Sequence, residues 1–193
     1  MSDQDDPNRT TQELIEQLGA DVDRCHGELI ETIDAGERNE DGTVSADYEY
    51  HARQLIRAIL AYIEGVTFSV KISAVDKCLR LGIEVSDHER FAAVEIDADV
   101  NDKGEVVERS AKIRFANNVR FAFRLLERAH GGTIKFDPSA EWWNDLRKTV
   151  KVRHRLMHPR YPADIDISSE EIISALRAKV GFVETLTTFS PSK

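Results

Sequence analysis

The chain has 193 residues, which is enough for one well-buried domain and short for two. Hydrophobic residues make up 41% and charged residues 32%, which argues against a disordered chain, and the net charge of −9 argues against nucleic-acid binding over the whole surface. Two cysteines are too few for a disulfide framework. With no leading apolar segment and no apolar run of roughly 18 residues, we expect a cytoplasmic protein that does not contact a membrane.

The N-terminal third predicts a polar tail followed by a helix. Residues 1–9 form the expected tail, and the helix is expected from Thr10 to a stop at Gly36. A loop is then expected over residues 35–47. The helix prediction depends on apolar residues at near-helical intervals: Leu14, Leu18, Val22, Leu29 and Ile33.

The most apolar part of the chain predicts a central helix from Asp47 to about Leu81, ended by Gly82. Within residues 55–70 it carries only two charges, Arg57 and Glu64. A capping-box pair, Ser86 and Glu89, then indicates a short helix.

The next segment predicts a small β-hairpin at about residues 95–112, because the turn sequence NDKG separates two alternating, valine-containing runs. A further helix with an apolar stripe is expected next, and it is expected to end at Gly131 and Gly132. Its apolar positions are Phe115, Val119, Ala122, Phe123 and Leu126.

The last third predicts two more helices. Asp137 and Pro138 are expected to cap and start the first, and a capping box of Ser168 and Glu171 starts the second. Together the elements predict an all-α fold, an antiparallel helical bundle with a small β-hairpin insertion, forming a single domain over residues 10–193.

Positive charge is concentrated near the end of the first of these two helices. Between Arg147 and Arg160 lie six basic residues and two histidines, with no acidic residue. Such a site could hold a phosphate-bearing ligand, or the cations could simply complement the helix dipole in solvent. A second basic run contains Lys112, Arg114, Arg120, Arg124 and Arg128 against the single acid Glu127.

Two residues of the stretch RHRLMHPR (153–160) are placed unusually. On a helical wheel Arg153 falls in the middle of an apolar face formed by Trp143, Leu146, Val150 and Met157. Burying an unpaired guanidinium there costs several kcal/mol. We therefore expect Arg153 to have an anionic partner or to face a groove, and Glu64 is the candidate partner. His158 precedes Pro159, which disfavours the α conformation, so the helix is expected to end at about Met157. Taken alone, His158 could simply cap that helix end.

The pair Arg153 and His158 forms an R-x-x-x-x-H motif, preceded by the helix WWNDLRKTVKV and followed by another helix. This arrangement, over about residues 47–189, resembles the HEPN superfamily (higher eukaryote and prokaryote nucleotide-binding domains). In that family the residue after the arginine is often Asn, Asp or His, and His154 fits. The hairpin is not part of the family's core pattern.

The resemblance implies a homodimer in which two motifs face one another across a cleft. In catalytic members it implies a metal-independent RNA endonuclease without a cofactor. Arg153 would then hold the scissile phosphate and His158 would act as acid or base, while His154 and Arg155 would position the RNA. The family also suggests a toxin–antitoxin or antiviral-defence setting with an antitoxin or another protein partner.

A second interpretation is a non-catalytic HEPN-like module that binds a nucleotide, an RNA or a protein partner. In that case Arg153 would pair with a carboxylate and organise a dimer interface without meeting phosphate. Cleavage of RNA in EDTA, abolished by changes at Arg153 and His158, would distinguish the enzyme from the module.

Overall fold

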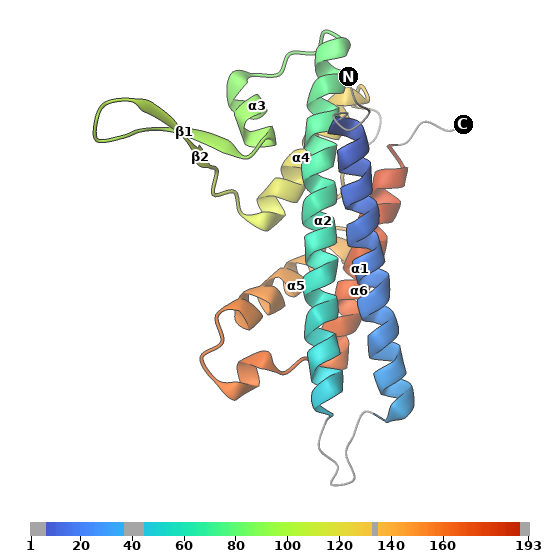
Figure 1. Ribbon diagram of the computed structural model, residues 1–193. Helices are drawn as coiled ribbons and strands as arrows, with labels where there is room; N and C mark the ends of the chain where they lie inside the picture. The colour runs from blue at the N-terminus through green and yellow to red at the C-terminus, as the bar shows by residue number, and fades with distance from the viewer. Residues whose placement is uncertain (1–6, 37–44, 133–134, 190–193) are drawn as a thin grey trace. The chain divides into compact units, whose positions relative to one another are not determined.

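The computed structural model describes residues 7–36, 45–132 and 135–189. The described residues form six α-helices, a short 3-10 helix and one two-stranded antiparallel sheet (Figure 1). The predicted all-α bundle with a β-hairpin insertion is confirmed. The elements in chain order are α1 (Pro7–Ala35), α2 (Ala46–Arg80), α3 (Asp87–Ala93), β1 (Ile96–Val100), β2 (Val106–Ser110), α4 (Phe115–Ala129), α5 (Glu141–Met157), the 3-10 helix (Pro162–Ile165) and α6 (Ser169–Thr187).

Caps and glycines in the sequence predicted most helix ends to within a few residues of their positions in the structure. Helix α2 stops just before Gly82, which has a φ of 69°, a left-handed conformation that costs glycine little. Helix α3 starts with the expected capping box: Glu89 N–H donates to Ser86 Oγ at 3.3 Å, and Ser86 N–H donates to the Glu89 carboxylate at 3.0 Å. These stops and starts depend on neighbouring residues only, which is why the sequence reveals them.

Two boundaries differ from expectation. Helix α1 begins at Pro7, before Thr10, and the rest of the expected tail, residues 1–6, lies outside the described residues. Residues 37–44 of the expected loop also lie outside them. The cap predicted at Asp137 is wrong, because α5 begins at Glu141 after a turn that starts at Pro138. An Asp–Pro pair favours turn initiation as readily as helix initiation.

The described chain packs as two compact units, and helices α2 and α6 contribute to both. Unit 1 comprises Met1–Gly65 and Pro138–Glu184, and unit 2 comprises Val66–Asp137 and Thr185–Lys193. Compact packing does not decide whether the units fold independently, so the single domain stays a prediction.

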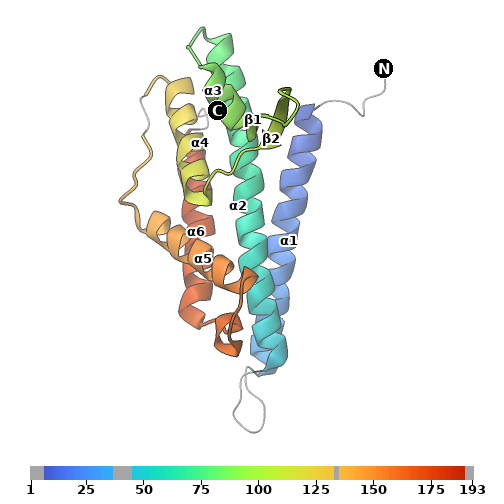
Figure 2. The ribbon, with the colours of Figure 1, turned by 90° about the vertical axis from the view of Figure 1, so that its left-hand side faces the viewer.

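Unit 1 is a layer of helices in which α1 lies alongside the first part of α2 (Figures 1 and 2). The two helices approach closely at Gly65, where an added Cβ would lie 2.5 Å from Leu18 Cδ1. Helices α5 and α6 also approach closely, since a Cβ at Gly181 would collide with Trp142. The core of the unit includes Val22, Leu29, Leu55, Ile56, Ile59, Leu60, Ile63, Trp143, Leu146, Ala175 and Ala178.

Helix α2 supplies much of the core. Among the described residues it is the one helix long and apolar enough to cross a membrane, and 44% of its most apolar window is buried within the structure. The core helix of a soluble protein passes the same test of length and composition. This helix is therefore consistent with the core helix of a soluble protein.

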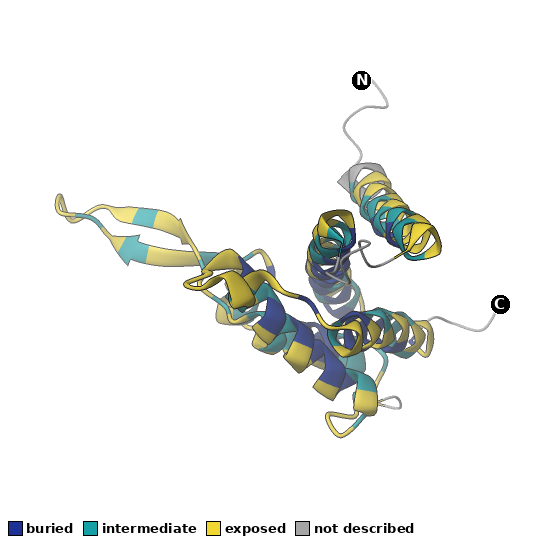
Figure 3. Ribbon diagram, turned by 90° about the horizontal axis from the view of Figure 1, so that it is seen from below, coloured by how far each residue is buried: buried dark blue, intermediate teal, exposed yellow. Residues whose placement is uncertain are grey.

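Unit 2 carries the hairpin. Strand β1 pairs antiparallel with β2, with Ile96 opposite Ser110 and Val100 opposite Val106. The two strands extend away from α3 and α4 and contain no buried residue (Figures 1 and 3). The fold therefore exposes the hairpin rather than using it to cover a core.

A buried polar network lies at the base of the hairpin. The Lys71 side chain is fully buried, and its Nζ donates to Glu95 Oε1 at 2.7 Å and to Asn118 Oδ1 at 2.8 Å. Asn118 Nδ2 also donates to Glu95 Oε1, at 2.7 Å. Burial lowers the pKa of Lys71, and the nearby Glu95 opposes that shift. Helix α2, the start of β1 and helix α4 are thereby tied together through three side chains.

Candidate functional site

Helix α5 ends where the sequence predicted, at Met157. His158 has φ −133° and ψ 54°, outside the helical region, while its backbone N–H still reaches the carbonyls of His154 and Arg155 at 3.2 and 3.3 Å. The His158 side chain is exposed. A proline at the next position accounts for the break, because it disfavours the α conformation of the residue before it. The imidazole is therefore held on a turn and is open to solvent.

Arg153 is less buried than the sequence predicted. Its side chain is 37% exposed, so the expectation of a guanidinium sunk among core positions is wrong. The buried face of α5 instead runs through Trp143, Asp145, Leu146, Thr149, Val152 and Leu156. The helical wheel gave Met157 a core place, but Met157 is 56% exposed because the chain turns away just after it. Arg153 consequently lies at the edge of the buried face.

The predicted partner of Arg153 is confirmed. Arg153 Nη2 lies 3.5 Å from Glu64 Oε2, and the Glu64 side chain is 49% exposed. An exposed ion pair of this kind contributes about 0–1 kcal/mol to stability. The pair can therefore orient the guanidinium while adding little to stability.

The structure brings His154 and His158 together at the end of α5. The rings of His154 and His158 have centroids 5.1 Å apart and are inclined at 60°, and both side chains are exposed. Within the described part of the chain, no hydrogen bond or ion pair joins Arg153 to His158. The end of α5 thus presents two neighbouring imidazoles, with the guanidinium held separately by Glu64.

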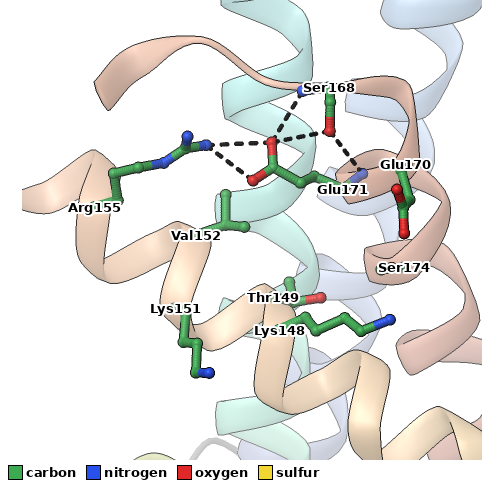
Figure 4. Close-up of a pocket in the computed structure, with 9 residues that line it drawn as sticks. All are labelled: Lys148, Thr149, Lys151, Val152, Arg155, Ser168, Glu170, Glu171 and Ser174. Carbon is green, nitrogen blue, oxygen red and sulfur yellow. Dashed lines mark hydrogen bonds and ion pairs between the residues drawn. The ribbon is translucent and has the colours of Figure 1, made fainter. Parts of the chain in front are cut away.

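Arg155 has a different environment. Its Nη2 donates to both carboxylate oxygens of Glu171 at 3.1 and 3.2 Å (Figure 4). The same Nη2 donates to the Asp166 carbonyl at 2.8 Å. The same Glu171 completes the capping box with Ser168 at the start of α6, as predicted. Arg155 therefore ties the end of α5 to the start of α6. Its role in positioning RNA stays a prediction.

The space between α5 and α6 forms a pocket that sequence reasoning missed. It has a volume of about 450 Å³. Lys148 extends from α5 in the direction of α6 (Figure 4), and its Nζ lies 3.2 Å from Asp145 Oδ1. Asp145 is itself only 3% exposed. The pocket is lined by Lys148, Thr149, Lys151, Val152, Arg155, Ser168, Glu170, Glu171 and Ser174. A basic helix followed by a capping box was the available signal for it.

The fold and the end of α5 define the chain as a helical protein with a solvent-facing cationic helix terminus. Comparison with family models, curated proteins and solved structures finds no match for it. Among the described residues, no group of three His, Cys, Asp or Glu side chains is placed to hold a metal ion. The resemblance to the HEPN superfamily therefore stays a prediction from the sequence.

Proposed function

We propose that the chain is a metal-independent RNA endonuclease of the HEPN type, acting at the cleft of a homodimer. One observation carries the proposal: the end of α5 presents His154 and His158 to solvent beside a partly exposed Arg153, whose ion pair within the described part of the chain is the exposed contact with Glu64. These side chains can bind a substrate without breaking buried interactions of the folded protein.

The residues suit cleavage through the ribose 2′-hydroxyl. A base takes the 2′-OH proton, the 2′ oxygen forms a bond to phosphorus, and the bond from phosphorus to the 5′ oxygen breaks as an acid protonates that oxygen. The products are a 2′,3′-cyclic phosphate and a 5′-hydroxyl. Imidazole serves in either role near neutral pH. His158 takes one role, and the neighbouring His154 or the same motif of the second copy is available for the other.

Arg153 acts on the phosphate. Negative charge builds up on the phosphoryl oxygens during attack, and a guanidinium can donate to two of them at once. The 3.5 Å contact with Glu64 holds the guanidinium in place between substrates. A phosphate that replaces Glu64 retains the charge pairing, so little is lost in the exchange.

The test is cleavage of end-labelled single-stranded RNA by purified protein in EDTA. Arg153→Ala and His158→Ala should each lower the rate by about 10²–10⁴-fold. Arg177→Gln and His26→Ala are matched controls, because both residues are exposed and lie elsewhere in unit 1. RNA with a 2′-deoxy sugar at the cleaved position should resist. A folded wild-type protein that leaves RNA intact, or that cuts single-stranded DNA equally well, contradicts the proposal.

The binding module is the second candidate, and one observation favours it. Both arginines of the motif contact carboxylates, Arg153 with Glu64 and Arg155 with Glu171, as expected where arginines organise structure. An inert wild type whose affinity for RNA or a nucleotide falls with Arg153→Ala would support the module.

The cellular setting belongs to the same proposal. Both cysteines, Cys25 and Cys78, are free, which agrees with a cytoplasmic location. We place the protein in a toxin–antitoxin or antiviral-defence system, with an antitoxin or another protein as its regulator.

A further inference from the structure

The hairpin exposes an apolar face. Side chains alternate along a strand, so Ile96, Ala98 and Val100 share one face of β1, and the register adds Val106, Glu108 and Ser110 from β2. This face is apolar towards the tip of the hairpin, where Val100 is opposite Val106. Val100 is 60% exposed and Val106 is 76% exposed. An isolated two-stranded hairpin is marginally stable in water. An uncovered apolar face on such a hairpin suggests that something else covers it.

The hairpin is ordered at both ends without help from that face. At its base Glu95 has a φ of 58°, unusual for a residue with a side chain, and Lys71 and Asn118 hold its carboxylate. At its tip Asn101 Oδ1 accepts hydrogen bonds from the backbone N–H groups of Lys103 and Glu105, each at 3.0 Å. The direction and the turn of the hairpin are therefore fixed in advance of any contact, as suits a docking arm.

Charge indicates the kind of surface that would bind the hairpin. Residues 96–110 contain five acidic and two basic side chains. A partner surface should therefore combine exposed apolar groups with positive charge.

The turn after α5 is such a surface. Met157 is 56% exposed and Tyr161 is 72% exposed. Residues 147–160, at the end of α5 and the start of the turn, contain six basic side chains and no acidic one, and Asp164 and Asp166 follow later in the turn. Ile165 adds a third apolar side chain, 37% exposed. These exposed fractions, like those of Val100 and Val106, refer to a single copy of the chain. Among the described residues, Val106 and Tyr161 are the most exposed apolar side chains of the two surfaces, and a second molecule could cover both.

We propose that the apolar face of the hairpin docks on the α5 exit turn, the surface that carries Met157, Tyr161 and Ile165, of a second copy of this chain. By two-fold symmetry the contact occurs twice, hairpin to turn and turn to hairpin. The hairpin of each copy then borders the Arg153 and His158 motif of the other. This inference rests on the dimer in the proposed function, and it does not depend on RNA cleavage.

Disulfide trapping between two differently tagged, co-expressed chains tests the contact. In a Cys25→Ser background, one chain carries Val106→Cys and the other carries Tyr161→Cys; Cys78 is buried. Oxidation should link the two tags in one covalent dimer. The matched control replaces Val106→Cys with Leu14→Cys, a residue of α1 that is 50% exposed. Trapping no greater than this control overturns the inference. A chain that carries both Val106→Cys and Tyr161→Cys, and that forms its disulfide only within one molecule, also overturns the inference.

Sedimentation equilibrium gives the second test. Val106→Glu and Tyr161→Glu should each raise the dimer dissociation constant at least tenfold, whereas Leu14→Glu should not. The two altered residues are largely exposed, so folding should be retained, which circular dichroism checks. A wild type that stays monomeric, or a dimer indifferent to both changes, overturns the inference. A trapped dimer that does not cleave RNA rejects the nuclease and leaves the docking contact standing.

Discussion

Two ion pairs, one in each unit, show how burial assigns a charge to structure or leaves it available. In unit 1 Arg153 and Glu64 lie 3.5 Å apart with side chains 37% and 49% exposed. In unit 2 Lys71 and Glu95 lie 2.7 Å apart, Lys71 is fully buried, and Asn118 bonds to both. Water competes for the first pair and is excluded from the lysine of the second.

The comparison separates two consequences of removing a cation. Loss of Arg153 should leave the folded state nearly unchanged and remove a group that a substrate can use. Loss of Lys71 should leave a cavity and an unsatisfied acceptor. The largest expected effect is therefore on activity in unit 1, and the next largest is on stability in unit 2.

The first prediction is that activity and stability respond independently at the end of α5. Arg153→Ala should lower RNA cleavage by about 10²-fold or more. The same change should alter the free energy of unfolding by less than about 1 kcal/mol. Cleavage assays and urea titration of the same preparation measure the two quantities. A loss of stability as large as that of a core substitution would place Arg153 in the structure instead.

The second prediction concerns the base of the hairpin. Lys71→Ala should lower the free energy of unfolding by about 3 kcal/mol, because it empties a buried site and removes the donor to Glu95 and Asn118. Lys71→Met keeps most of the volume and should cost less. Urea titration measures both. If the two variants unfold like the wild type, the network does not hold unit 2 together.

The third prediction is a dependence of stability on pH. Burial of Glu95 by itself raises its pKa, but hydrogen bonds from Lys71 and Asn118 and the charge of Lys71 outweigh burial, so the pKa lies below its ordinary value. Since the unfolded chain binds the proton more tightly, this contribution is present above the ordinary glutamate pKa and is lost as pH falls through the folded-state pKa.

The measurement is the free energy of unfolding between pH 7 and pH 3. Wild type should lose stability towards the acid end. The acid loss should be smaller in Lys71→Met, which lacks the strongest donor to Glu95. Equal slopes in the two proteins would show that Lys71 does not lower the pKa of Glu95.

The features that could be predicted from the sequence are mostly those set by residues close to one another along the chain. The end of α2 just before Gly82, the two capping boxes and the hairpin turn are set by residues within a few positions of one another. The pairing of Arg153 with Glu64 was predictable for another reason: Glu64 is one of two charges in the apolar segment 55–70.

The rest depends on contacts that no local pattern encodes. Lys71 bonds to residues 24 and 47 positions away, and nothing near it in sequence marks it as buried. The exposure of Arg153 was missed because polar Asp145 and Thr149 take part in the buried face of α5, which a wheel of apolar residues cannot show. The pocket between α5 and α6 was missed for a similar reason, since its lining comes from two separate segments.

The smallest expected effects compare two glutamates that each bind an arginine of the motif. Glu171→Gln weakens the link to Arg155 and the capping box of α6, and it should cost about 1–2 kcal/mol of unfolding free energy. Glu64→Gln removes only the exposed pair with Arg153 and should cost less than about 1 kcal/mol. Thermal or urea unfolding can rank the two. The reverse order would mean that the Arg153 pair, despite its exposure and its 3.5 Å separation, is the structural one, and that Arg155 is the guanidinium free to meet phosphate.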